Sequence, residues 1–97
     1  MTLGLFHNNF TLNSNTGTLL TIPQNQEDEY HLVFTVQNVD SLYNVYIGSA
    51  SVSTTSFGYK LLPGGVFTAD LLPNEDIYAV CDSGQSVQVA TFWLKRL

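Results

Sequence analysis

Apolar residues recur at every second position in several short segments of this chain, which is the pattern of β-strands with one buried face. In residues 30–37, Leu32, Phe34 and Val36 occupy alternate positions. Residues 86–95 alternate in the same way, and near their end both sets of positions become apolar. The first segment therefore predicts a half-buried strand, and the end of the second predicts a strand that is buried on both faces.

Turn residues separate these segments from other short apolar runs. Pro followed by Gly or Asn occurs in residues 61–65, LLPGG, and again ten residues later in 71–75, LLPNE, and such pairs favour tight turns. Residues 82–85 form a further turn signal, and the Ser/Thr-rich residues 49–56 predict a loop or an edge strand. Between these signals, further strands are expected at residues 19–22, 43–48, 66–71 and 77–81.

No segment shows the period of an amphipathic helix, and the strands recur about every ten residues. We therefore expect an all-β fold, an antiparallel β-sandwich of jelly-roll type, with a small β-barrel as the alternative. The 97 residues are expected to form a single β domain over 1–97. Residues 1–29 are the most polar third, and they predict either an extended N-terminal arm that orders on binding or the first strands.

The polar surface of the chain is mainly uncharged. Charged residues make up 11% of the sequence, against an average of about 25%, whereas Thr, Ser, Asn and Gln supply 31 of the 97 residues. The net charge is −5, and the only basic residues are Lys60, Lys95 and Arg96. Because nucleic acids and anionic membranes are bound through many basic residues, neither is an expected partner.

Residues suited to catalysis or metal binding are few. His7 and His31 are the only histidines, and the sequence contains no nucleophile elbow, phosphate-binding loop or zinc-ligand spacing. Cys81, the single cysteine, lies in an apolar run and is expected to be buried. Turn capping and solubility account for the carboxylates near turns, which are Asp70, Glu75, Asp76 and Asp82. We expect no enzymatic activity, no cofactor and no metal.

A series of motifs in the second part of the chain carries a family resemblance. Residues 45–48, VYIG, precede the Ser/Thr-rich loop, and residues 57–65, FGYKLLPGG, follow it. Residues 71–80, LLPNEDIYAV, continue the series, ahead of a Ser-Gly pair and of residues 87–89, VQV. With these motifs, residues 43–90 resemble small virion proteins of tailed bacteriophages.

This resemblance implies a structural virion protein that binds the outside of a bacteriophage capsid as a decoration or cement protein and stabilises the head. It implies the major capsid protein as partner and a homo-oligomer, with a trimer favoured. The expected location is the capsid surface of the virion, after synthesis in the cytoplasm of the bacterial host.

The candidate contact residues for such a partner are apolar or aromatic. The N-terminal segment from Leu3 to Phe10 is the leading candidate. Trp93 fits a core position better than an interface, although Trp is enriched in binding hot spots. Alternation alone does not say which tyrosines face outwards. The complete candidate set is Leu3, Leu5, Phe6, Phe10, Tyr43, Tyr46, Tyr59, Trp93 and Leu97.

Two other functions stay open. The chain could be a phage tail, neck or fibre component whose exposed aromatic residues contact host surface glycans. It could instead be a non-viral carbohydrate-binding or adhesion module, although the start of the sequence has no export signal. The number of copies in the virion separates decoration from a tail part, and glycan binding tests the third function.

Overall fold

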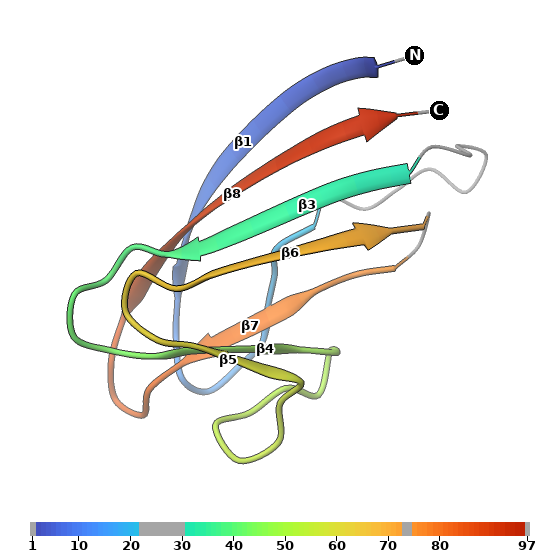
Figure 1. Ribbon diagram of the computed structural model, residues 1–97. Coiled ribbons are helices and arrows are strands. Elements are labelled where there is room, and N and C mark those ends of the chain that lie inside the picture. The colour runs from blue at the N-terminus through green and yellow to red at the C-terminus, as the bar shows by residue number, and fades with distance from the viewer. Residues whose placement is uncertain (1, 22–30, 73–74, 97) are drawn as a thin grey trace.

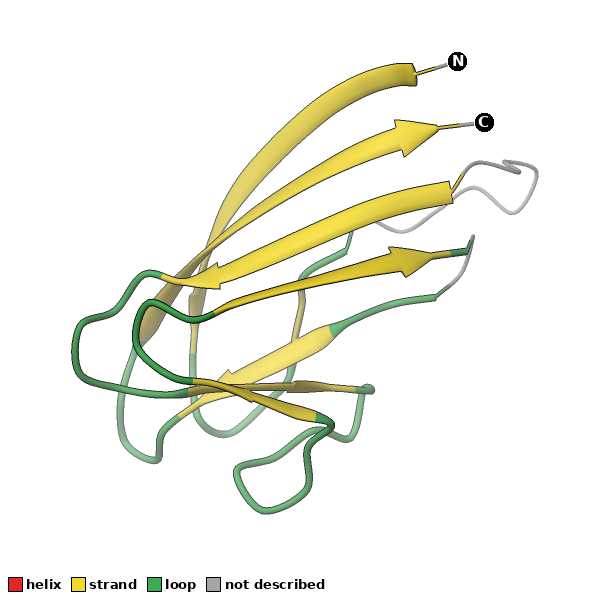
Figure 2. Cartoon of the chain, in the orientation of Figure 1, coloured by secondary structure: helices red, strands yellow, loops and turns green. Residues whose placement is uncertain are grey.

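The computed structural model contains two four-stranded antiparallel sheets, and no helix is present in its described residues (Figures 1 and 2). It describes residues 2–21, 31–72 and 75–96, and within these ranges it describes all side chains except those of 2–4, 31–32 and 95–96. The strands are β1 (Thr2–Leu12), β2 (Thr18–Leu19), β3 (His31–Asn38), β4 (Val45–Gly48), β5 (Tyr59–Leu61), β6 (Val66–Leu71), β7 (Tyr78–Cys81) and β8 (Val87–Arg96).

The strand order within each sheet brings distant parts of the chain together. Sheet A has the order β1-β8-β3-β6, and sheet B has the order β2-β7-β4-β5. The pairs are nested, since β1 pairs with β8, β2 with β7, β3 with β6, and β4 with β5. The described strands thus form two separate sheets, as a sandwich-like fold requires, and not one closed barrel.

The two sheets share one hydrophobic core. Sheet A contributes Phe34 and Val36 from β3, and sheet B contributes Val45 and Ile47 from β4. Phe34, Val36 and Val45 have no exposed surface, and the period-two pattern of residues 30–37 is thus confirmed. Burying side chains of this size contributes roughly 1.5–3 kcal/mol each, so the alternation also fixes which face of each sheet turns inwards.

The expected burial of both faces at the end of β8 is wrong. Trp93 on the inner face is 6% exposed, but Phe92 on the outer face is 45% exposed. Sheet B covers only the inner face of sheet A, and none of the described elements forms a third layer over the outer face (Figure 1). The outer apolar side chains at this end of β8 therefore face solvent.

Residues 2–12 form a long edge strand, β1, instead of an extended arm, and they pair with β8 along their length. The side chains of residues 5–9 are nevertheless exposed. The strands of sheet A extend past those of sheet B at the end where both termini lie (Figure 1), so this part of β1 has no opposing layer.

Several strand boundaries differ from the expected ones. The strand expected at 19–22 is β2, which spans Thr18–Leu19, and the polar loop after it lies outside the described residues. The short strand β5 (Tyr59–Leu61) was not expected, whereas residues 66–71 match β6 and residues 49–56 form a loop.

Candidate interaction surfaces

An apolar patch lies on the uncovered outer face of sheet A. Leu5 on β1 pairs with Leu94 on β8, which in turn pairs with Val33 on β3, so the three residues form one row across the sheet. Phe92 follows two positions away on the same face of β8, where it pairs with His7. Leu5 is 59% and Phe92 45% exposed, and Leu94 and Val33 are half-buried.

We call these four residues, Leu5, Val33, Phe92 and Leu94, the outer patch. Uncharged polar side chains continue the face beside it. Thr35 and Thr68 lie in the same row as Phe92, and their hydroxyl oxygens are 2.9 Å apart. The exposed Asp70 on β6 pairs with Val33 and adds one carboxylate to this margin. An apolar patch with a mainly uncharged margin suits contact with another protein surface, because little charge has to be desolvated.

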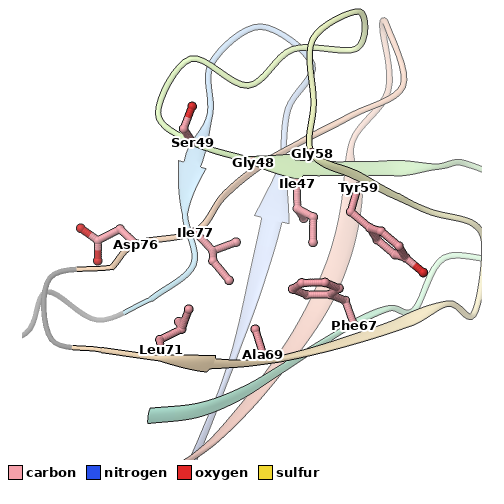
Figure 3. A pocket seen from close by; sticks show the side chains of 10 residues that line it. All are labelled: Ile47, Gly48, Ser49, Gly58, Tyr59, Phe67, Ala69, Leu71, Asp76 and Ile77. Carbon is pink, nitrogen blue, oxygen red and sulfur yellow. The ribbon is translucent and has the colours of Figure 1, made fainter. Parts of the chain in front are cut away.

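A second surface is a groove between the free edges of the two sheets (Figure 3). Its volume is about 410 Å³. Strand β6 provides one wall, strands β4 and β5 provide the opposite wall, and Ile77 closes one end. The apolar side chains that converge on it are those of Ile47, Tyr59, Phe67, Ala69, Leu71 and Ile77.

Two details define the rim of the groove. The Tyr59 ring centroid lies 5.1 Å from that of Phe67, so these two aromatic rings cover one part of the opening. At the other end, Asp76 accepts a 2.9 Å hydrogen bond from the hydroxyl group of Thr21. The groove is thus apolar inside and carries a carboxylate at its rim.

Two of the predicted contact residues, Tyr46 and Trp93, belong to the interior of the protein. Tyr46 is 8% exposed and Trp93 is 6% exposed. Trp93 packs between Phe6, at a ring-centroid distance of 5.7 Å, and Phe34, at 6.4 Å. Neither residue offers the surface that an interface anchor needs.

The other predicted contact residues are spread over the molecule. Leu5, Phe6 and Tyr59 are exposed by 59%, 45% and 47%. Phe10 and Tyr43 are half-buried against the core. Leu3 lies in β1, but its side chain is outside the described residues, as is Leu97. Leu5 joins the outer patch, and Tyr59 lines the groove at the opposite side of sheet A.

The sequence analysis missed Phe92 and Leu94 as surface residues and the walls of the groove altogether. The signal for the first two was present, because both faces of β8 become apolar near its end, but it was interpreted as internal burial. No local sequence pattern could indicate the groove, because one wall comes from sheet A and the other wall from sheet B.

Two of the carboxylates near turns accept hydrogen bonds from backbone N–H groups. Glu75 accepts a 2.7 Å hydrogen bond from the backbone N–H of Leu72, and Asp82 accepts one of 2.8 Å from that of Asn44. His7 is exposed on β1, opposite Phe92. Within the described ranges, no three His, Cys, Asp or Glu side chains gather in a way that could hold a metal ion.

No protein-family model matches the sequence, and a search among curated proteins finds no match either. Among the residues that the structure describes, none forms a helix with the length and hydrophobicity that a membrane crossing requires.

Proposed function

We propose that this protein is a structural virion protein that binds the outside of a bacteriophage capsid as a decoration or cement protein. The observation that carries the proposal is the outer patch. Its apolar side chains have the sequence pattern of a buried strand face, yet no element in the described part of the chain covers them (Figure 1). An external protein surface is the partner that such a face fits.

The strand order supports a jelly roll as the finer description of the fold. In a jelly roll, eight strands form two sheets through nested antiparallel pairs. The orders β1-β8-β3-β6 and β2-β7-β4-β5 agree with this arrangement. Jelly rolls occur in capsid and lectin domains, so this topology is compatible with a virion role without defining one.

The proposed mechanism is the addition of many weak contacts across neighbouring shell subunits. The outer patch of each copy would be buried against the major capsid protein. Removing a side chain such as Phe92 from water contributes roughly 1.5–3 kcal/mol, which alone gives weak binding. An oligomer that engages several sites at once converts such contacts into strong attachment, as expected for the trimer that the resemblance implies.

A tail, neck or fibre component could use the same patch, so copy number is the measurement that separates it from decoration. The proposal that such a component binds host glycans has less support. Of the three tyrosines among the candidate contact residues, Tyr46 is buried and Tyr43 is half-buried, whereas Tyr59 is exposed. One exposed ring among these three provides little of the aromatic platform that sugar stacking uses.

The proposal is tested first by quantitative mass spectrometry of purified virions. We expect this protein at a simple fraction of the copy number of the major capsid protein. A few copies per particle would contradict decoration and favour a tail or neck role, and absence from the particle would contradict any virion role.

A binding experiment then tests the outer patch itself. Shells that lack the protein are mixed with wild type, with Phe92→Glu, or with the control Gln37→Glu, which is exposed on the same face of sheet A but lies outside the patch and on the interior strand β3. Phe92→Glu should weaken co-sedimentation at least about tenfold, the equivalent of 1.4 kcal/mol per copy. Gln37→Glu should bind as wild type does. Equal binding by all three would exclude the patch.

A further inference from the structure

Among the described residues, the two edge strands of sheet A, β1 and β6, carry few of the features that normally keep strand edges apart. Monomeric proteins protect an exposed edge with charged residues, proline or a covering segment. Strand β1 contains eleven residues (Thr2–Leu12) without a charged residue or a proline, and β6 (Val66–Leu71) contains Asp70 as its one charge. Such edges are suited to pairing with another strand.

The two edge strands of sheet A run in opposite directions, as antiparallel pairing between two copies requires. Strand β1 is antiparallel to β8, β8 to β3, and β3 to β6, so β1 and β6 also run in opposite directions. A second copy displaced sideways along sheet A therefore brings its β1 antiparallel to β6 of the first copy, with inner faces on the same side. The result is one continuous antiparallel sheet.

The same displacement brings an exposed aromatic ring to the groove. One row of inner-face residues crosses sheet A as Phe6, Trp93, Phe34 and Ala69. Continuing this row into the second copy places its Phe6 beside Ala69, which lines the groove. Phe6 is 45% exposed in a single copy, so its free surface would cover the opening of the groove.

The positions of charged residues favour pairing of β1 with β6 over pairing of β1 with a second β1 or of β6 with a second β6. Lys95 and Arg96 lie at the end of β8, opposite the first residues of β1, and they are two of the three basic residues in the chain. Asp70 lies near the end of β6, and the exposed Glu75 and Asp76 follow it. Both groups belong to the same end of sheet A. Lys95 and Arg96 lie on β8, one strand inside the β1 edge, whereas Asp70 lies on the β6 edge itself.

Antiparallel addition of β1 to β6 brings the basic end of one copy next to the acidic end of the other. Antiparallel pairing of two β1 edges or of two β6 edges would instead place these ends far apart. We propose that copies of this protein associate head to tail, with β1 of one copy extending sheet A of the next at β6. Repeated head-to-tail contacts close into a ring when the rotation between copies allows it. The association needs no capsid, and it holds or fails independently of the proposed function.

Charge reversal at each edge tests this contact in the full-length protein. One variant carries Glu75→Lys and Asp76→Lys, and the other carries Lys95→Glu and Arg96→Glu. Sedimentation velocity should show an oligomer for wild type, and each variant should associate at least about tenfold more weakly, because like charges then meet at the edge. Phe92→Glu, outside both edges, should associate as wild type does.

An equimolar mixture of the two charge variants is the decisive sample. In a head-to-tail contact, the altered β6 edge of the first variant is complementary in charge to the altered β1 edge of the second, and the two unaltered edges are complementary to each other. Mixing should therefore restore association between unlike copies. A wild-type protein that stays monomeric into the millimolar range would overturn the proposal. So would association that both variants leave unchanged, or a mixture that stays as weak as its components.

Discussion

The hydroxyl group of Tyr46 donates a 2.7 Å hydrogen bond to Oδ1 of Asp82. The other carboxylate oxygen, Oδ2, accepts a 2.8 Å bond from the backbone N–H of Asn44, and the N–H of Asp82 donates to the Asn44 carbonyl at 3.2 Å. The ammonium group of Lys60 lies 5.7 Å from the centroid of the Tyr46 ring. These contacts fix the turn after β7 to the start of β4.

Asp82 should make stability depend on acid pH. The backbone N–H of Asn44 and the Tyr46 hydroxyl hold the pKa of this carboxyl below its ordinary value, although burial acts in the opposite direction. A lowered pKa in the folded state stabilises the protein above the unfolded pKa of about 3.9, and this contribution is lost as pH falls through the folded pKa. Urea unfolding should therefore show Asp82→Asn less stable than wild type at pH near 7, with the difference shrinking below about pH 4. A difference independent of pH would contradict this role.

Tyr46 should give the matching dependence at alkaline pH. The hydrogen bond to Asp82, followed by burial, raises the pKa of the Tyr46 hydroxyl. Its contribution to stability is present below the unfolded pKa of about 10 and is lost as pH rises through the folded pKa. In an absorbance titration of tyrosinate, the signal missing from Tyr46→Phe should have a midpoint above the ordinary tyrosine value of about 10. A missing signal at the midpoint of an ordinary tyrosine would count against this bond.

Asn38 should be one of the most sensitive polar positions. It is 0% exposed, and its Nδ2 group donates to the carbonyl of Tyr43 at 2.9 Å and to that of Leu61 at 3.1 Å. Removing the side chain leaves both carbonyls without this donor, so Asn38→Ala should cost about 3 kcal/mol of unfolding free energy. The exposed Asn9 provides a control, because Asn9→Ala should change stability by less than about 0.5 kcal/mol. Equal effects of the two substitutions would show that the Asn38 bonds contribute little.

The Cys81 thiol should be unreactive in the folded protein. It is 0% exposed, its Sγ lies 3.2 Å from the carbonyl oxygen of Gln85, and burial raises its pKa. Because the thiolate is the reactive form, a disulfide reagent should modify the native protein far more slowly than the urea-unfolded protein. Rapid modification of the native protein would mean that β7 opens readily. Cys81→Ala provides the baseline for both measurements.

The fold could be predicted from the sequence wherever alternation coincided with burial. Phe34 and Val36 illustrate this, because both lie where the period-two pattern placed them. Strand β1 was harder to recognise. Asn8 shares the inner face with Phe6 and Phe10, but it is exposed on the edge strand of sheet A, so a polar residue is tolerated there.

The interaction surfaces depend on pairings that local sequence does not encode. Leu5 and Leu94 form one row only because β1 pairs with β8 in a particular register. In the same way, Phe67 and Tyr59 come together because β6 and β5 lie at the same side of their two sheets. A strand pattern gives the face of each residue, whereas tertiary structure decides whether another layer covers that face.

The position of β8 inside sheet A has a consequence for biosynthesis. This strand, the last of the eight, lies between β1 and β3 and pairs with both. While the ribosome is still making residues 87–96, β1 has no neighbour in its sheet. Its apolar side chains are therefore not yet packed as they are in the native protein. The native sheet can therefore form only after this segment has left the ribosome, and until then the unpaired β1 is a site where the nascent chain can aggregate.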